Sequence, residues 1–496
     1  MKKIIFAFLL FFLMIILLSS SLRAQVATRE QAMTVAANWI HMIIEKKGDW
    51  GGSESAEVAE IEEFRRGNRV LGFFCRVEPQ GYIVVSLRKE MAPIKAYSAK
   101  YDLDPEAEEG MAALIKDRMD AFLTWIEQRF GPISSVRARE LDDVLESDYQ
   151  AVWGNLERNV AYFAMEAESG AITMDYQQGQ ELLTSSWNQG DPYNRQCPAP
   201  PPGVTCTAPH CLVGCGPLAT SQIMRYWGWP PYGVGSPYSN WYDWPNMPDT
   251  LTGSSPVAQI DAVAELCYEV GLAADEVYCE KGDCGSGNTL LDNMGALTNS
   301  FRYSTLASRE ERRLYSSTAA WFSAIKTELN QNRPILYEIP QHFIVIDGWQ
   351  EIGFPVVQQV HVVYGHGGSN DDWYTLDYNI PGTDPNWQWE KMVINTVPAQ
   401  ALGSSLSGVY SRDASFPFRC FDQDATGGSA TFSSGQNLQF LHNITVTCTS
   451  TSGGSIRFNG SSTLYTRLFS RGDPSRGVEI KNGSIKLGKN GSIKFH

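Results

Sequence analysis

The sequence predicts an α+β protein of several domains, and three observations support this prediction. The chain has 496 residues, which is too long for a single compact domain of about 100–200 residues. Its first part combines helical and strand-like periodicity, whereas its last part contains only short strand-like runs. Hydrophobic residues make up 43% of the chain and charged residues 19%, which is typical of globular proteins and excludes wholesale disorder.

The amino terminus predicts export. Lys2 and Lys3 precede an apolar run from Ile4 to Leu18, and Ala24 is a small residue suited to cleavage. These features are typical of a signal peptide over residues 1–24. The run is shorter than the ~20 residues that span a bilayer, so an uncleaved anchor is the less favoured alternative. We expect a secreted protein, in a compartment where disulfides persist.

Residues 25–178 are expected to form a small α+β domain. Apolar residues recur along one helix face over residues 32–43, after a capping box at Thr28. Strand-like runs follow at Leu71–Val77 and Gly81–Ser86. A second amphipathic helix extends over Met111–Phe130 and ends at a Gly-Pro pair. Few residues suited to nucleophilic chemistry occur here, so the region favours packing and binding over catalysis.

Two further regions follow. Residues 179–400 are rich in Trp, Tyr, Gly and Pro and contain most of the cysteines, and residues 401–496 turn to Ser, Thr, Gly and Asn. In the tail, Asn482–Lys486 recurs as Asn490–Lys494, with Gly454–Arg457 as a looser copy. These repeats predict a small all-β domain, which we interpret as a β-sandwich or stacked hairpins because two copies are too few for a solenoid. The net charge of −15 argues against a nucleic-acid binder.

Cys215 is the strongest candidate for a nucleophile. It precedes Pro217, which suits the first turn of a helix, and apolar residues then continue at helical spacing to Trp227. The positive end of a helix dipole favours the thiolate and lowers a thiol pKa. The alternative to a nucleophile is that Cys215 forms a disulfide or fills a core position. A zinc site made by Cys206, His210, Cys211 and Cys215 is a weaker one, because no second Cys-x-x-Cys pair occurs.

A thiolate nucleophile also needs a base and an oxyanion donor. Of the seven histidines, His342 is favoured slightly over His361 and His366, because it opens a predicted strand and would be held at a rigid strand end. Gln189, in a turn-rich segment upstream of Cys215, supplies a side-chain amide that fits an oxyanion donor.

These segments resemble the streptopain family of bacterial cysteine peptidases. The resemblance is carried by Trp187–Asn194, by Gly214-Cys215 and the helix that follows, and by His342–Gly348, in the same order and spacing. Residues 81–86 and 93–98 are similar to the family's propeptide. The resemblance covers residues 25–400. It implies a papain-like peptidase domain at 179–400, preceded by an inhibitory propeptide domain at 25–178 that is removed by a cut near Met174–Thr184.

The resemblance also implies residue roles. Cys215 would be the nucleophile, His342 the general base and Gln189 the oxyanion donor, with no cofactor and no metal. Gly285, Ser286 and Gly287 would line the substrate cleft, and Tyr364 would border the catalytic histidine. The expected partners are protein or peptide substrates and the chain's own propeptide, and the tail offers a possible cell-surface or glycan contact.

The chain departs from the family pattern beside the histidine. Where the family reads His-Val-Asn-Trp-Gly-Trp-Gly-Gly, this chain has Val363 in place of the asparagine and Tyr364 in place of the first tryptophan. The loss of that amide removes a group that orients the imidazole. We therefore keep two alternatives to a secreted zymogen-type endopeptidase. One is a weakened or inactive homologue that binds surfaces, and the other is a papain-like amidase or transpeptidase.

The remaining cysteines are interpreted as structural. Cys279 and Cys284 flank a short loop that they could close, and Cys420 with Cys448 is the expected pair in the tail. Three more cysteines lie close together in a Pro-rich loop, with a fourth as a possible partner: Cys197, Cys206, Cys211 and Cys267.

Overall fold

The computed structural model describes residues 26–376 and 390–398, apart from residues 109, 137–139, 142–144, 146–148, 173, 231, 281 and 354, together with short strands between residues 420 and 495. The predicted signal peptide lies outside the described residues. Among the helices that are described, none is both long and apolar enough to cross a bilayer.

The first region contains two long helices and a four-stranded meander. In chain order the elements are α2 (Arg29–Lys47), β1 (Glu57–Arg66), β2 (Arg69–Glu78), β3 (Tyr82–Ser86), β4 (Ile94–Ser98), α3 (Gly110–Phe130), α5 (Gln150–Leu156), α6 (Val160–Glu168) and β5 (Tyr176–Gln178). The predicted capping box of α2 is confirmed, because Thr28 Oγ1 accepts from the backbone N–H of Gln31 and the Gln31 side chain accepts from the Thr28 N–H. Both predicted helices and both predicted strands are present.

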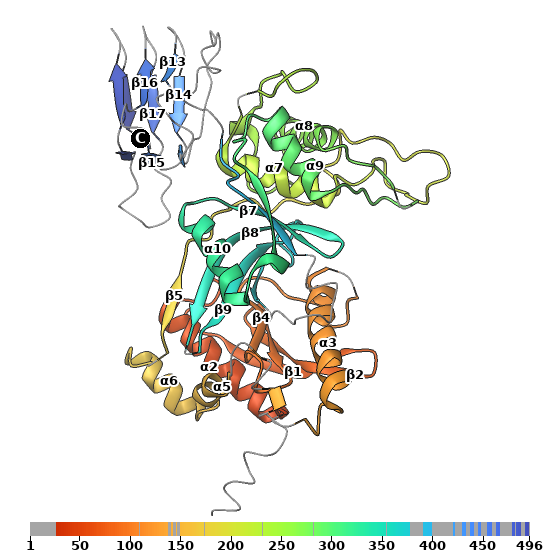
Figure 1. The fold of residues 1–496 in the computed structure, drawn as a ribbon, viewed down its shortest axis with the longest axis vertical. Helices are drawn as coiled ribbons and strands as arrows, with labels where there is room; N and C mark the ends of the chain where they lie inside the picture. The colour runs from red at the N-terminus through yellow and green to blue at the C-terminus, as the bar shows by residue number, and fades with distance from the viewer. Residues whose placement is uncertain are drawn as a thin grey trace, which may run out of the picture.

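The second region combines a helical part with a strand-rich part. Its elements are α7 (Cys215–Trp227), α8 (Val257–Ala273), α9 (Leu290–Gly295), β6 (Ser308–Glu311), α10 (Thr318–Asn330), β7 (Ile335–Ile339), β8 (His342–Ile352), β9 (Val357–Val363), β10 (Asp372–Thr375) and β11 (Lys391–Ile394). In Figure 1 the green helices α7, α8 and α9 lie together at one end of this region, and the strands β7, β8 and β9 lie between them and the first region.

One sheet joins the two regions. Its strand order is β1-β2-β3-β4-β10-β9-β8-β7-β11-β6, and β5 pairs with β8. The junction is the antiparallel pairing of β4 with β10, in which Tyr97 faces Trp373 and Ala96 faces Tyr374. Across it, Tyr82 donates to Asp372 at 2.5 Å. The first region thus extends the sheet of the second by strand addition.

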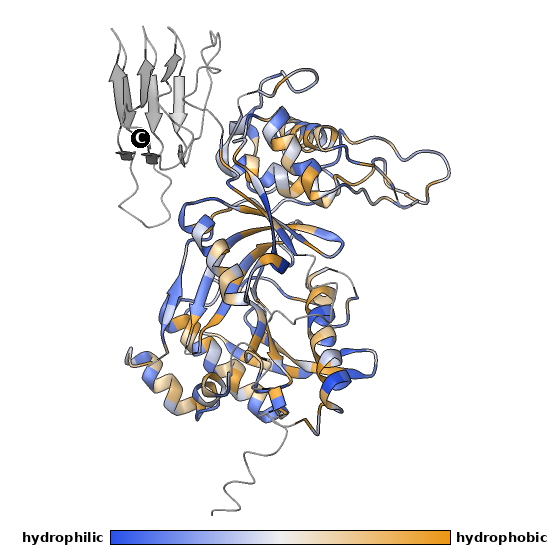
Figure 2. Ribbon diagram, viewed as in Figure 1, coloured by the Kyte–Doolittle hydropathy of each residue, from blue (hydrophilic) through white to orange (hydrophobic). Residues whose placement is uncertain are grey.

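The core follows this shared sheet. Every residue of β3, β4 and β10 is buried. Helix α2 packs against the first strands, and its Trp39, Ile40 and Ile43 are buried. Figure 2 shows hydrophobic stretches along the central strands and the helices beside them. The buried hydrophobic residues of the two regions belong to one continuous cluster, so the regions stabilise each other.

The strands between residues 420 and 495 pair only in parallel. Three stacks form, in the orders β12-β15-β18, β13-β16-β19 and β14-β17-β20. The first stack contains Cys420–Phe421, Thr445–Thr447 and Glu479–Lys481; the second contains Ser429–Phe432, Gly454–Phe458 and Gly483–Leu487; the third contains Asn437–Phe440, Thr463–Thr466 and Ser492–Phe495. The described residues of the tail form strands, as the sequence predicts, but the interpretation as stacked hairpins is wrong for them, because hairpin strands are antiparallel. Cys448 lies outside the described residues, so its pairing with Cys420 stays a prediction.

The junction between β3, β4 and β10 predicts a specific loss of stability. Tyr82→Phe removes the hydroxyl that donates a hydrogen bond to Asp372 Oδ2, so this buried carboxyl oxygen loses that donor. We expect the free energy of unfolding to fall by about 1–3 kcal/mol, measured by urea denaturation of the full chain. Tyr162→Phe, at a side chain that is 49% exposed, is the control and should change it by less than about 0.5 kcal/mol. Equal effects of the two substitutions would contradict the role of this contact.

Candidate active site

Cys215 is the first residue of α7, as the sequence predicts. Gly214 precedes the helix with a φ of +93°, and a Cβ there would meet the Glu276 carboxyl oxygen at 2.1 Å, so only glycine fits. Pro217 lies in the first turn and Gly228 ends the helix in the left-handed conformation. The thiol is therefore held at a helix amino terminus, on a buried helix.

The start of β8 lies beside this sulfur. The backbone N–H of Phe343 hydrogen-bonds to Cys215, and Phe343 is the residue that follows His342 in the strand. Burial raises the pKa of the Tyr364 hydroxyl, and the charge of the Cys215 thiolate acts in the same direction. The fold thus brings the helix start, the strand start and the loop after β9 together.

The imidazole of His342 is oriented by a backbone carbonyl. His342 Nε2 lies 2.9 Å from the Tyr364 oxygen, and the two rings stack with centroids 4.3 Å apart. Because a carbonyl can only accept, Nε2 carries the proton and Nδ1 is left unprotonated. The Tyr364 N–H in turn donates to Asp371 Oδ1 at 2.8 Å, which fixes the peptide that holds the ring. The Tyr364 carbonyl thus orients the His342 imidazole, as an amide side chain at position 363 would.

Burial sets the charge state of this pair. It raises the pKa of Cys215 to about 11, with the buried Glu276 carboxyl acting in the same direction. It lowers the pKa of His342 to about 4, against the effect of the Tyr364 carbonyl. The expectation that the helix terminus would lower the thiol pKa is therefore wrong for this form of the chain. Backbone N–H groups do favour the thiolate, but desolvation outweighs them.

Gln189 lies at the same cavity as His342. Its backbone carbonyl accepts from the Val213 N–H at 3.0 Å, which ties its loop to the segment that leads into Cys215. A cavity of about 760 Å³ is lined by Gln189, His342 and Tyr364. Residues of α3, among them Leu114 and Arg118, line the same cavity. The first region therefore covers the candidate site.

The other histidines occupy different surroundings. His366 lines the same cavity, with its ring centroid 5.8 Å from that of His342. His361 instead pairs with the buried Asp347 at 2.6 Å, and this carboxylate helps to raise its pKa to about 9 despite burial. A cationic, paired imidazole is a poor general base, which agrees with the preference for His342.

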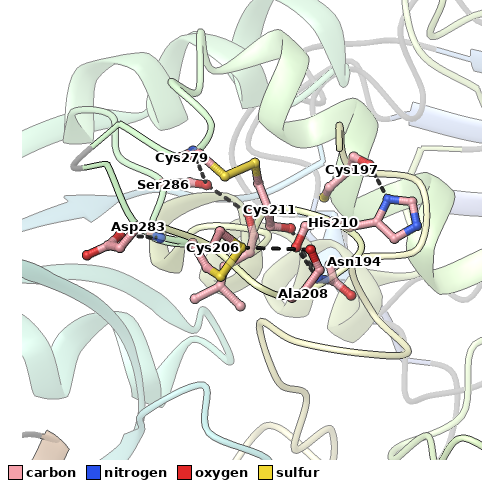
Figure 3. Close-up of a disulfide and its surroundings, with 12 residues drawn as sticks. Asn194, Cys197, Cys206, Ala208, His210, Cys211, Cys279, Asp283 and Ser286 are labelled. Carbon is pink, nitrogen blue, oxygen red and sulfur yellow. Dashed lines mark hydrogen bonds between the residues drawn. A yellow bond between two sulfur atoms is a disulfide. The ribbon is translucent and has the colours of Figure 1, made fainter. Parts of the chain in front are cut away.

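Two disulfides attach the loop of Gly285, Ser286 and Gly287 to the segment before Cys215. They join Cys206 to Cys284 and Cys211 to Cys279, and Ser286 Oγ donates to the Leu212 carbonyl at 2.8 Å. Figure 3 shows Cys279 bonded to Cys211, with Ser286 beside them. The loop therefore lies next to the helix start, where the resemblance expects a substrate-binding segment.

These pairings correct two interpretations. A bond between Cys279 and Cys284 is wrong, because each is bonded to a cysteine from the Pro-rich loop. Cys206 and Cys211 are consumed by the same bonds, so the zinc alternative loses two of its four ligands. Cys197, Cys215 and Cys267 carry no disulfide.

Sequence reasoning missed three contributors to the site: the Phe343 backbone, the Tyr364 carbonyl and Asp371. Two of them act through the main chain, so side-chain identity carries no signal for them. Asp371 follows a glycine-rich turn, and nothing in the sequence links it to the Tyr364 peptide.

Comparisons with known proteins match the chain to cysteine peptidases and their inhibitors. Residues 187–374 match the model of the Peptidase C10 family, and residues 24–122 match that of the Spi protease inhibitor. Streptopain from Streptococcus pyogenes serotype M28 is 25% identical over 362 residues, which cover 66% of this chain and 79% of that protein. Streptopain from serotype M1 gives the same figures.

Two solved structures from Prevotella intermedia are also similar. A prointerpain A fragment has a TM-score of 0.46 at 20% identity, and the aligned region covers 68% of this chain and 98% of the fragment. Active wild-type interpain A has a TM-score of 0.35 at 25% identity, and the aligned region covers 44% of this chain and 94% of the interpain A chain. The two family models match separate parts of the chain. The comparisons therefore support a cysteine-type endopeptidase, with a Peptidase C10 domain at residues 187–374 that follows a protease-inhibitor domain at residues 24–122.

Proposed function

We propose that this chain is a secreted, zymogen-type endopeptidase in which Cys215 and His342 form the catalytic dyad. The observation that carries the proposal is the position of the Cys215 sulfur against the start of β8, where His342 keeps Nδ1 free by donating from Nε2 to a carbonyl. A thiol and an unprotonated imidazole nitrogen at one site are what general-base-assisted thiol attack requires.

The reaction would proceed through an acyl-enzyme. His342 takes the Cys215 proton, and the sulfur attacks the scissile carbonyl carbon to form a C–S bond. The Gln189 amide stabilises the resulting oxyanion. Collapse of this intermediate breaks the C–N bond as His342 protonates the leaving amine. Water, deprotonated by the same imidazole, then attacks the thioester and releases the carboxylic acid, which regenerates the thiol.

Latency would follow from burial by the inhibitory domain. With α3 over the cavity, Cys215 has a pKa of about 11 and His342 one of about 4. Both groups are then neutral at pH 7, and the thiolate that attacks carbonyls is scarce. Removal of residues 25–178 would return water to the site and lower the desolvation cost of the ion pair.

The predicted cleavage segment is attached to the peptidase region. Tyr176–Gln178 pairs with β8, and the Leu182 and Leu183 N–H groups donate to Asp347. The proposal also includes the domain boundaries after residues 178 and 400. It includes export directed by residues 1–24, and a surface or glycan contact made by residues 401–496.

The dyad predicts the effect of removing the sulfur. Cys215→Ala should lower hydrolysis of a denatured protein by about 10⁴-fold or more, and His342→Ala should do the same, because the two groups act as a unit. Cys75→Ala, which removes a buried thiol from the inhibitory domain, is the control and should keep full activity after maturation. Hydrolysis by Cys215→Ala at the wild-type rate would refute the dyad.

The oxyanion role predicts a different kinetic signature. Gln189→Ala should lower kcat by about 10²–10³-fold with little change in KM, because the lost hydrogen bond forms only in the transition state. Steady-state kinetics on one peptide measure this. Gln196→Ala removes an amide from an exposed contact with the Asp261 carbonyl and should leave both constants unchanged. An unchanged kcat for Gln189→Ala would exclude the role.

A further inference from the structure

We propose that Glu390 forms an acidic subsite of the mature peptidase, which Arg118 of the inhibitory domain occupies in the precursor and a basic substrate side chain occupies afterwards. This inference rests on the proposed function, since it describes how the same cleft selects its substrate.

The Glu390 carboxylate, which pairs with Arg118, forms a well-defined binding position for a cation. Arg118 Nη2 lies 2.8 Å from Glu390 Oε1, and the two side chains are only 4% and 6% exposed. The other carboxylate oxygen, Oε2, is held by Arg312 Nη1 at 2.7 Å and by the Tyr337 hydroxyl at 2.6 Å. Arg312 and Tyr337 both belong to the peptidase region. They fix the carboxylate, whereas its Oε1 faces a residue of the domain that maturation removes.

The strand register places this carboxylate near the candidate dyad. In the pairing of β7 with β8, Ile339 faces His342. In the pairing of β11 with β7, Lys391 faces Glu338, so Glu390 comes next, beside Ile339. Two strand spacings separate Glu390 from His342, which is about 10 Å. Arg118, which pairs with Glu390, also lines the cavity that contains Gln189, Ile339 and His342, and we infer that its departure opens Glu390 to the same cleft.

Charge decides what can replace Arg118. The two arginines hold the pKa of Glu390 at about 2 although burial opposes this, so the group is an anion at neutral pH. When Arg118 leaves, Oε1 loses a charged partner at a largely enclosed position. A guanidinium or ammonium group restores that partner, whereas a neutral or acidic side chain leaves the carboxylate underpaired. The structure therefore assigns a preference for arginine or lysine at one position close to the scissile bond.

The test compares matched peptides on the matured full-length chain. Quenched fluorescent peptides would carry arginine, citrulline or glutamate at each position on either side of the cleaved bond, and kcat/KM would be measured for each. Citrulline keeps the shape of arginine without its charge. We expect one position at which arginine exceeds citrulline by about 10- to 100-fold, the range of a charged hydrogen bond.

Variants connect that preference to Glu390. Glu390→Gln should abolish the preference for arginine, so that this variant cleaves the arginine and citrulline peptides at rates within about twofold of each other. Glu338→Gln is the matched control. It removes the same charge from β7, where Glu338 pairs with Lys391 at 2.9 Å, and it should keep the preference. If Glu390→Gln alone fails to fold, Arg118→Gln combined with Glu390→Gln removes both charges of the pair from the precursor.

The outcomes separate the two proposals. Equal rates for arginine and citrulline at every position, in a wild-type chain that cleaves both, overturn the subsite and leave the dyad standing. Persistence of the arginine preference in Glu390→Gln also overturns it. A wild-type chain that cleaves no peptide, in the same way as Cys215→Ala, overturns the proposed function and the subsite with it.

Discussion

The pairing of β4 with β10 is the constraint on which the rest of the structure depends. It joins the inhibitory and peptidase domains into one sheet, with Tyr97 facing Trp373. Because a strand pairing fixes both register and direction, it also fixes where α3 lies relative to β7 and β8. In that position Leu114 and Arg118 line the same cavity as His342. Covering of the site is thus a consequence of main-chain geometry, to which side chains add specificity.

Two electrostatic effects compete at Cys215. A helix amino terminus and nearby N–H groups favour the thiolate, whereas burial of the sulfur disfavours it. Desolvation prevails in the full chain, where it also disfavours a charged His342. At Glu390 the same burial has the opposite result, because two arginines and a tyrosine hydroxyl satisfy the carboxylate. Burial therefore keeps Cys215 and His342 neutral and leaves the ion-paired Glu390 charged.

Local sequence signals predicted those parts of the fold that local chemistry determines. The Thr28 cap and the start of α7 at Cys215 follow from side chains within one helical turn. The prediction missed β1, because it is a charged edge strand with few buried residues. It also paired Cys279 with Cys284, because their short spacing favours a small loop. In the fold, each of them bonds to a cysteine far away in the sequence, at separations of 68 and 78 residues. The Tyr364 carbonyl that orients His342 has no signal in any side chain.

The most direct test of this account is a titration of the Cys215 thiol before and after removal of the inhibitory domain. Thiolate absorbance near 240 nm would be followed against pH for the wild-type chain minus Cys215→Ala, in the precursor and in the matured form. We expect no Cys215 step below about pH 10 in the precursor, since the thiol pKa is about 11 there. After maturation we expect a step below about pH 8.5, the pKa of an unperturbed thiol. The same titration midpoint in both forms would contradict the claim that burial by this domain keeps the peptidase latent.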